Sequence, residues 1–405
     1  MFKLFGTARA STDEKAIRDI LTRGVEDVFV RESLEGKLKS GQKLRVKLGF
    51  DPTGSQIHIG RAIVLRKLKA FQDLGHTIVF IAGDFTAMIG DPSDKLEKRP
   101  MLSREKIGEN LQTYKKQVGK IIDVSKAEFR YNSEWLEKLT FSEIAELAES
   151  FSVQQMSNRR NFKDRFDRGE EVSLREFLYP LMQGYDSVAV DADVEIGGFD
   201  QLFNLKAGRM IQKHYRKPEQ DILTTQMLEG TDGRKMSTSW GNVITIIDEP
   251  NDMYGKVMSI KDDLIIKYFL LCTELSLEEI ESLKKSLENG TNPKEIKMRL
   301  AQEIVTIYHG KEKAEKAEKQ FTETFSRGGV PEDVLGIQAV RGEKMSDVFV
   351  RAGIVASKSE WRRLVDEGAV TNLDSNTTIK DFYLEVSESG TYKIGKRRFI
   401  KIVVS

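Results

Sequence analysis

The sequence predicts an α/β protein that begins with a parallel sheet, continues with an all-helical segment and ends with a small α+β segment. First, an apolar strand pattern at residues 44–50 precedes a helical pattern at 59–71 and a continuous apolar run at 77–82. Strand, helix and strand in this order predict a parallel pair, with ligands bound at the carboxyl ends of the strands. Second, residues 251–324 are helical in pattern throughout. Third, glycine and proline cluster at 326–331, which is typical of a linker.

The other elements follow along the chain and place a helical insertion within the sheet region. Residues 2–41 are mixed polar and helical in character, with an expected N-cap at Ser11 or Thr12. Ser276 is expected to cap a later helix, and after residue 341 helical patterns precede short strands. Helices are expected at 103–118, 134–150, 201–214, 277–287 and 293–308, strands at 129–131, 194–197 and 222–228, and a mostly helical stretch at 153–186.

Composition excludes several classes of protein. At roughly 150 residues per domain, 405 residues predict two or three domains, and 39% hydrophobic residues suffice for a sizeable core. The net charge of +1 argues against a surface coated in basic residues for nucleic acid, although it leaves room for a local basic patch. No apolar run approaches the roughly 18 residues of a membrane-spanning helix, and residues 1–10 do not form a secretory signal. A single cysteine, Cys272, excludes a disulfide framework and a cysteine-cluster zinc site. We therefore expect a soluble cytoplasmic protein that does not bind a membrane.

Two segments carry the residue types of a nucleotide site. Residues 52–61 lie at a strand-to-helix turn, where backbone N–H groups and the helix dipole favour an anion, and Gly60 leaves room for a flat base. Residues 235–239 lie in a loop rich in glycine, lysine and serine, which is suited to closing over phosphates. Neither segment matches a P-loop or a dinucleotide fingerprint. Taken alone, His58 would be a helix cap and the second segment an ordinary loop, but their pairing on two halves of one α/β region favours nucleotide binding.

The two segments resemble the HIGH and KMSKS signatures of class I aminoacyl-tRNA synthetases. Over nearly its whole length the chain is similar to tyrosyl-tRNA synthetases of the bacterial form that ends in an S4-type RNA-binding module. Further matching segments are residues 49–53, 83–93, 179–186, 197–201 and 357–365 with Gly368. The resemblance implies a Rossmann-like catalytic domain at 1–245 with a helical insertion at about 95–190, a helical anticodon-side domain at 246–327 and an S4-like domain at 341–405.

The resemblance also implies the reaction and its partners. Tyrosine and ATP would give tyrosyl-adenylate and pyrophosphate, and the tyrosyl group would then pass to tRNA(Tyr). Mg²⁺ would accompany ATP as substrate, with no tightly bound cofactor and no metal site in the protein. Because no covalent enzyme intermediate is needed, positioning and charge stabilisation would dominate catalysis. Relatives are homodimers, which places the expected interface within residues 95–190.

The tyrosine pocket can be assigned position by position from the resemblance. Tyr179, Gln183 and Asp91 match residues that hold the amino group of the substrate, and Gln201 approaches its carboxyl end. Asp186 matches the acceptor of the phenol hydroxyl. Independently, the spacing of 179, 183 and 186 places three polar residues on one helical face, which is a poor pattern for a core. The whole expected tyrosine-binding set is Lys47, Gly49, Asp91, Tyr179, Gln183, Asp186 and Gln201.

The ATP and RNA sites follow from the same resemblance. His58, Arg61 and Lys235 are the expected catalytic residues, because such donors stabilise phosphate charge better in the transition state than in the ground state. The expected ATP-binding set is Asp51, Thr53, His58, Gly60, Arg61, Asp200, Lys235, Met236, Ser237, Thr238 and Ser239. The expected RNA-binding residues are Lys358, Arg362, Arg363 and Arg397.

Three departures from the family pattern leave alternatives open. Arg61 replaces the usual second histidine of the first signature, Thr238 replaces the second lysine of the other, and Lys47 replaces a tyrosine found in many relatives. One alternative is therefore a synthetase-derived RNA-binding protein that has lost activation. The other is the tryptophan-specific relative, which the tyrosine pattern and the S4-like tail disfavour.

Overall fold

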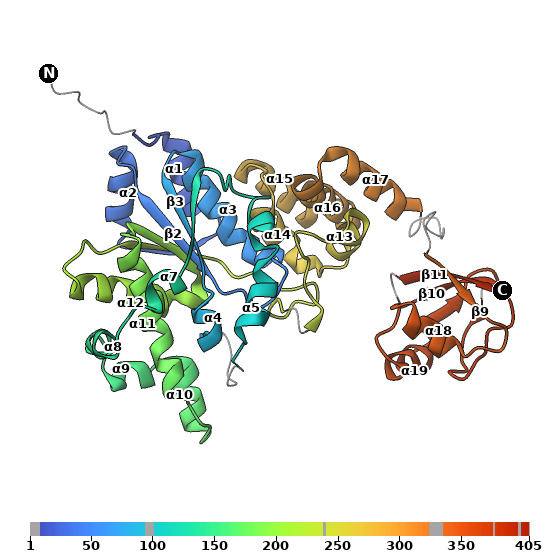
Figure 1. Cartoon of the computed structure of the whole chain (residues 1–405). Helices are drawn as coiled ribbons and strands as arrows, with labels where there is room; N and C mark the ends of the chain where they lie inside the picture. Colours follow the sequence, from blue (N-terminus) through green and yellow to red (C-terminus); the bar gives the residue numbers. More distant parts are fainter. Residues whose placement is uncertain are drawn as a thin grey trace. The chain divides into compact units, whose positions relative to one another are not determined.

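The structure is a computed structural model that describes residues 9–93, 101–237, 240–323, 335–375, 377–395 and 398–404 (Figure 1). The chain forms two compact units, one from residues up to 249 together with 256–308, and the other from 250–255 together with the residues from 309 onward. Each unit is described by itself below.

The first unit is built on a parallel sheet. In the described part of the chain its strands are β1 Val25–Phe29, β2 Arg45–Phe50, β3 Thr77–Ala82, β4 Ala127–Tyr131, β5 Val194–Gly198 and β6 Asp221–Thr225. Their order is β1-β6-β5-β2-β3-β4, and every neighbouring pair is parallel except β1 with β6. The chain runs from β2 outward to β3 and β4, and returns to the other side of β2 at β5. The order therefore reverses between β2 and β5, which is where open α/β sheets bind ligands.

The predicted α/β fold is confirmed, with corrections to individual elements. The apolar runs at 44–50 and 77–82 are β2 and β3, and nearly all of β3 is buried as expected for a parallel strand covered on both faces. Strand β1 was missed, because its sequence VEDVF is short and acidic and lies at the edge of the sheet. The strand expected at 222–228 ends at Thr225, where the chain leaves the sheet.

Helices cover both faces of this sheet. Helix α3 (Ile59–Asp73) packs on β2, β3 and β5, whereas α12 (Leu202–His214) packs on β5 and β6 and along α11 (Leu174–Ala189). Right-handed crossovers in opposite directions along the sheet put α3 and α12 on opposite faces. Helix α1 (Glu14–Thr22) is capped by Asp13, whose carboxylate accepts from the amide of Ala16, so the cap expected at Ser11 or Thr12 is wrong. Helix α2 spans Arg31–Lys39.

The insertion between β3 and β5 is mainly helical. Its elements are α4 Thr86–Ile89, α5 Arg104–Leu111, α6 Tyr114–Val118, β4, α7 Ser133–Leu136, α8 Phe141–Ala148, α9 Val153–Ser157, α10 Arg160–Asp167 and α11. The helical segments expected at 103–118 and 134–150 are confirmed, and each consists of two short helices separated by a turn. The mostly helical stretch at 153–186 is confirmed.

Five helices follow the sheet in the described residues, and one of them begins at the cap predicted for it. They are α13 Pro250–Met258, α14 Ile265–Cys272, α15 Leu277–Glu288, α16 Pro293–His309 and α17 Lys311–Phe321. Ser276 caps α15 in a reciprocal pair with Glu279, as expected. The end of α14 is held to the sheet unit, because Arg23 donates to the carbonyls of Leu270, Thr273 and Leu275. Arg66 of α3 donates to the Thr273 carbonyl at 2.6 Å, so two cations satisfy carbonyls that the helix leaves unpaired.

The second unit contains a small α+β fold. Its described strands are β7 Leu335–Ala339, β8 Val370–Asn372, β9 Thr377–Thr378, β10 Gly390–Ile394 and β11 Arg398–Val404, in the order β7-β11-β10-β8-β9. Helices α18 (Met345–Arg351) and α19 (Lys358–Asp366) precede the described strands after residue 341, as predicted, and β7 lies before that segment. Trp361 packs on Phe349 in the core of this unit. The linker expected at 326–331 lies outside the described residues.

Candidate active site

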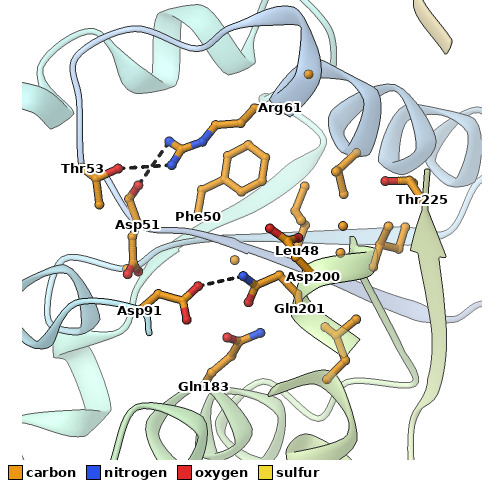
Figure 2. A pocket seen from close by; sticks show the side chains of 18 of the residues that line it. Leu48, Phe50, Asp51, Thr53, Arg61, Asp91, Gln183, Asp200, Gln201 and Thr225 are labelled. Atoms are coloured by element: carbon orange, nitrogen blue, oxygen red, sulfur yellow. Dashed lines mark hydrogen bonds between the residues drawn. The ribbon is translucent and has the colours of Figure 1, made fainter. Parts of the chain in front are cut away.

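A cavity of about 220 Å³ opens at the carboxyl ends of β2 and β5, where the strand order reverses (Figure 2). Residues that are distant in sequence meet there. The predicted residues that line it are Gly49, Asp51, Thr53, His58, Gly60, Arg61, Asp91, Tyr179, Gln183, Asp186, Asp200, Gln201, Lys235 and Met236. Lys47 and Ser237 are not among the lining residues, and Thr238 and Ser239 lie outside the described residues.

Asp51 is held at the floor of the cavity by two hydroxyl donors. Thr86 Oγ1 donates to one carboxylate oxygen at 2.7 Å and Tyr179 Oη donates to the other at 2.9 Å. Burial raises the pKa of Asp51 to about 6, against the lowering effect of these hydrogen bonds. A Cβ at position 83 would lie 2.1 Å from Asp51 Oδ1 and 2.4 Å from Thr86 Oγ1, so this close approach requires Gly83.

Asp91 and Gln201 form a second polar cluster. Gln201 Nε2 donates to Asp91 Oδ2 at 2.7 Å (Figure 2). Asn204 Nδ2 donates to Gln201 Oε1 at 2.9 Å, and the buried Arg159 donates to Asn204 Oδ1 at 3.1 Å. Asn204 and Arg159 were missed by sequence reasoning. Asn204 shares a helical face with Gln201 at i+3, which is a usable signal, whereas no regular spacing in the sequence links Arg159 to the other residues of the cavity.

Asp186 is buried and receives donors from Asn132, which follows β4, and from Trp135 of α7. Trp135 Nε1 donates to one oxygen at 2.8 Å, and Asn132 Nδ2 lies 3.4 Å from the other. Burial raises the pKa of Asp186 to about 7, although Lys47 and these two donors lower it. Trp135 and Asn132 were also missed. The available signal was that Asn132 directly follows a strand at the ligand-binding edge of the sheet.

Lys47 lies behind the cavity wall and is fully buried. Its ammonium is 2.9 Å from Glu195 Oε1 of β5 and donates to the Gln183 carbonyl at 3.0 Å and to Ser187 Oγ at 2.8 Å. Gln183 Nε2 also donates to Glu195 Oε1, at 3.1 Å. Glu195 was not foreseen, since nothing in the spacing of the sequence links it to Lys47.

His58 and Arg61 occupy the start of α3 on the other side of the cavity. His58 Nδ1 accepts from the amide of Arg61 at 3.3 Å and so caps the helix. Burial, reinforced by the neighbouring Arg61 and Lys235, lowers the pKa of His58 to about 3. The imidazole is therefore neutral at pH 7 and carries its proton on Nε2. Arg61 is fixed by Tyr114 Oη at 2.9 Å and Thr53 Oγ1 at 3.1 Å.

Gly60 separates His58 from Met236. A Cβ on Gly60 would lie 3.1 Å from His58 Nδ1 and 3.3 Å from Met236 Sδ. The glycine therefore makes room for two side chains of the protein itself, in addition to lining the cavity.

The loop that carries Lys235 is organised by one side chain. Asn242 Nδ2 donates to the Lys235 carbonyl at 3.0 Å and to Asp232 Oδ1 at 2.8 Å, while its Oδ1 accepts from the amide of Ser237 at 2.8 Å. Lys235 Nζ lies 3.5 Å from Asp200 Oδ2. The loop thus places a cation at the mouth of the cavity, and Asn242 was not foreseen.

The described residues contain no group of three or more histidine, cysteine, aspartate or glutamate side chains arranged to hold a metal ion. Within the same ranges, no helix has the length and apolarity to cross a membrane.

Comparison with known proteins identifies the family. Residues 39–326 match the family model for class I tRNA synthetases (W and Y). Over 395 residues the chain is 45% identical to the tyrosine–tRNA ligase of Thermotoga maritima, covering 96% of this chain and 98% of that protein. The chain belongs to the tyrosyl-tRNA synthetase family of class I. A second tyrosine–tRNA ligase, from Carboxydothermus hydrogenoformans, is 46% identical over 399 residues, covering 95% of this chain and 97% of that protein.

Solved tyrosyl-tRNA synthetases share the fold. A C-terminally truncated mitochondrial tyrosyl-tRNA synthetase from Aspergillus nidulans matches with a TM-score of 0.64 and 22% identity, over 76% of this chain and 94% of that one. The Archaeoglobus fulgidus tyrosyl-tRNA synthetase complexed with L-tyrosine matches with a TM-score of 0.60 and 21% identity, over 75% of this chain and 99% of that one. The similarity supports the Rossmann-like class I architecture predicted for residues 1–245.

Proposed function

We propose that the cavity at the carboxyl ends of β2 and β5 is where this tyrosine–tRNA ligase forms tyrosyl-adenylate, before the tyrosyl group passes to tRNA(Tyr). The observation that carries the proposal is the convergence on one cavity of residues from both signature segments and from the predicted tyrosine pocket. The chain is similar over nearly its full length to tyrosine–tRNA ligases. This similarity does not favour the two alternatives, a tryptophan-specific relative and an RNA-binding protein that has lost activation.

The tyrosine side of the cavity suits an amino acid with a phenol ring. The Asp186 carboxylate is positioned to accept from the phenol hydroxyl, because Trp135 and Asn132 fix its orientation. A substrate without the hydroxyl would leave this buried acceptor unpaired, which is the physical basis for rejecting phenylalanine. Asp91, Tyr179 and Gln183 also line the cavity and provide acceptors and dipoles for the ammonium group.

The opposite side suits the triphosphate of ATP. Attack of the tyrosine carboxylate on the α-phosphorus forms the adenylate bond and expels pyrophosphate, so negative charge moves onto the leaving oxygens. The neutral His58 can donate through Nε2–H, and Arg61 and Lys235 supply positive charge. Fixed donors of this kind stabilise the transition state without reorganising. Mg²⁺ would accompany ATP as part of the substrate.

Amino-acid-dependent exchange of labelled pyrophosphate into ATP tests this proposal directly. We expect exchange with tyrosine alone among the twenty amino acids, without tRNA, because adenylate formation precedes transfer. Exchange with tyrosine would also show that Thr238 is tolerated in place of the usual lysine. Absence of exchange with every amino acid, in protein shown to be folded by circular dichroism, would contradict the proposed site.

We further propose that the helical insertion forms a homodimer interface. Phe141, Val153 and Leu174 are 87%, 73% and 74% exposed, although each is a bulky apolar side chain. Such exposure within one region is typical of a surface that another protein covers. Sedimentation equilibrium should give twice the chain mass of 46.1 kDa, and Phe141→Asp should shift the protein toward monomer. A wild-type protein that sediments as a monomer would contradict the proposal.

The last proposed contact is between tRNA and the C-terminal α+β fold. Lys358, Arg362 and Arg363 lie on α19. Lys358 pairs with Asp347, and the Arg362 guanidinium lies 4.5 Å from the centre of the Phe382 ring. Arg397 lies outside the described residues.

Removing the three α19 cations should separate the two half-reactions. The triple alanine variant should keep pyrophosphate exchange but charge tRNA less well. The slope of the logarithm of the tRNA binding constant against the logarithm of salt concentration should become shallower by about one unit for each phosphate contact that is lost. Aminoacylation measured across a salt series provides the check. An unchanged slope would remove α19 from the tRNA interface.

A further inference from the structure

A buried charged cluster lies directly behind the tyrosine side of the cavity. The Lys47 ammonium contacts Glu195, Ser187 Oγ and the Gln183 carbonyl, all within 3.0 Å. The other Glu195 oxygen accepts from Ser187 Oγ at 3.1 Å and from Gln220 Nε2. The side chains of Lys47 and Glu195 are 0% and 1% exposed. The pair therefore has nearly all its polar atoms satisfied by protein groups, although an ion pair is costly to bury.

The surrounding backbone is shaped to admit this cluster. A Cβ on Gly208 of α12 would lie 2.4 Å from Gln220 Nε2, 2.9 Å from Ser187 Oγ and 3.1 Å from Glu195 Oε2. No side chain larger than hydrogen fits at that position without displacing the cluster. The approach of α12 to the sheet thus depends on the same groups that enclose Glu195.

Asp186 shares this environment. Its neighbours Gln183 and Ser187 are the two residues of α11 that contact the Lys47–Glu195 pair. The titratable groups that face Asp186 in the described residues are Lys47 from β2, Glu195 from β5 and Tyr179 from its own helix, with Trp135 and Asn132 as neutral donors. Burial raises the pKa of Asp186, the charge of Lys47 lowers it, and the charge of Glu195 raises it.

We propose that the buried Lys47–Glu195 pair is a positioning element that fixes the turn of α11 carrying Asp186 and sets how readily Asp186 ionises to accept the phenol hydroxyl of tyrosine. Neither residue lines the cavity, so the pair acts on the substrate only through Asp186 and Gln183. This inference rests on the proposed role of Asp186 in tyrosine recognition. It assigns to Lys47 a function different from direct tyrosine binding.

The proposal fixes the sign of a pH effect. The ionised form of Asp186 accepts a hydrogen bond from the phenol, and the protonated form has lost that charged acceptor. Tyrosine use in the wild type should therefore rise with pH through the Asp186 pKa of about 7. Removing the Lys47 cation should move that midpoint to higher pH, and removing the Glu195 anion should move it to lower pH.

The experiment compares Lys47→Met, Glu195→Gln and the double variant in the full-length protein. The kcat/KM for tyrosine in pyrophosphate exchange is measured from about pH 5 to pH 9. We expect midpoints displaced in opposite directions by at least about half a pH unit, with the double variant near the wild type. Lys67→Met is the matched control. Lys67 is another buried lysine, bonded to three carbonyls near the end of α1 and outside the cavity lining, so its loss should leave the midpoint unchanged.

The outcomes separate this inference from the proposed function. Displacements in the same direction, or none, would overturn the role of the pair while the wild-type midpoint still supports Asp186. If Asp186→Asn keeps both wild-type tyrosine use and the midpoint, the proposed tyrosine site itself fails. Lys47→Met leaves Glu195 unpaired and could therefore fail to fold. In that case Glu195→Gln and the double variant still show whether the midpoint of the pH profile is lowered or not displaced.

Discussion

An Asp186→Ala variant is expected to lose about 10- to 100-fold in kcat/KM for tyrosine while its use of phenylalanine is unchanged or improved. The carboxylate is buried and receives Trp135 and Asn132, so it is oriented before substrate arrives. Losing a charged hydrogen bond of this kind costs about 1–3 kcal/mol. Phenylalanine has no hydroxyl to lose, and without Asp186 it no longer leaves a buried acceptor unpaired, so only tyrosine use should fall. Pyrophosphate exchange with each amino acid gives the two values of kcat/KM.

A matched variant separates recognition from general damage. Asp73→Ala removes an exposed carboxylate of α3 that pairs with Lys69, far from the cavity lining. It should leave both amino acids unaffected. If Asp186→Ala lowers kcat/KM equally for tyrosine and phenylalanine, with unaltered thermal unfolding, Asp186 does not recognise the hydroxyl.

Lys235→Met should lower kcat for adenylate formation by about 100- to 1000-fold, the usual cost of removing one preorganised donor from a developing anion. The lysine lies at the mouth of the cavity in a loop that Asn242 organises through backbone contacts, so the loop should keep its conformation in the variant. Because the ammonium acts on phosphate charge, KM for tyrosine should change little. Single-turnover kinetics measured by quenched flow would separate the chemical step from binding.

Lys116→Met serves as the control for Lys235→Met, because Lys116 is an exposed lysine of α6 that does not line the cavity. Its kcat should match that of the wild type. If Lys235→Met raised KM for ATP at unchanged kcat, the lysine would contribute equally to the ground state and the transition state. That result would show that Lys235 is not one of the catalytic residues.

Sequence reasoning located the cavity because its determinants are local. The strand–helix–strand pattern at 44–82 set the parallel pair, and parallel strands place their carboxyl ends at one edge. Residues that directly follow those ends, such as Asp51 after β2 and Gly83 after β3, therefore converge whatever the details of the loops. The helical spacing of Tyr179, Gln183 and Asp186 likewise places these three side chains on one face of their helix.

The supporting residues could not be predicted in the same way. Glu195 meets Lys47 only because β5 returns beside β2, and this strand order is a tertiary fact. Arg159 reaches Asn204 across the insertion without any regular spacing. Strand β1 was missed for a related reason, since an acidic edge strand is stabilised by its pairing with β6 and carries little apolar signal of its own.

The departure at Arg61 has a structural explanation. Its guanidinium is already held by Tyr114 and Thr53, and it lies over the ring of Phe50 (Figure 2). A cation fixed by neutral groups keeps its full charge available to a phosphate. Arginine therefore provides at this position a permanent charge that a buried histidine would lose, as the lowered pKa of His58 shows.

Helix α3 connects two regions that are far apart in the sequence, the cavity at its first turn and the end of α14. Its first turn is capped by His58, and about two turns later Arg66 donates a hydrogen bond to the Thr273 carbonyl at the end of α14. An α-helix resists bending over so short a distance, so α3 rigidly connects the cavity to the end of α14. A displacement of α14 would therefore be transmitted through α3 to His58, which lines the cavity.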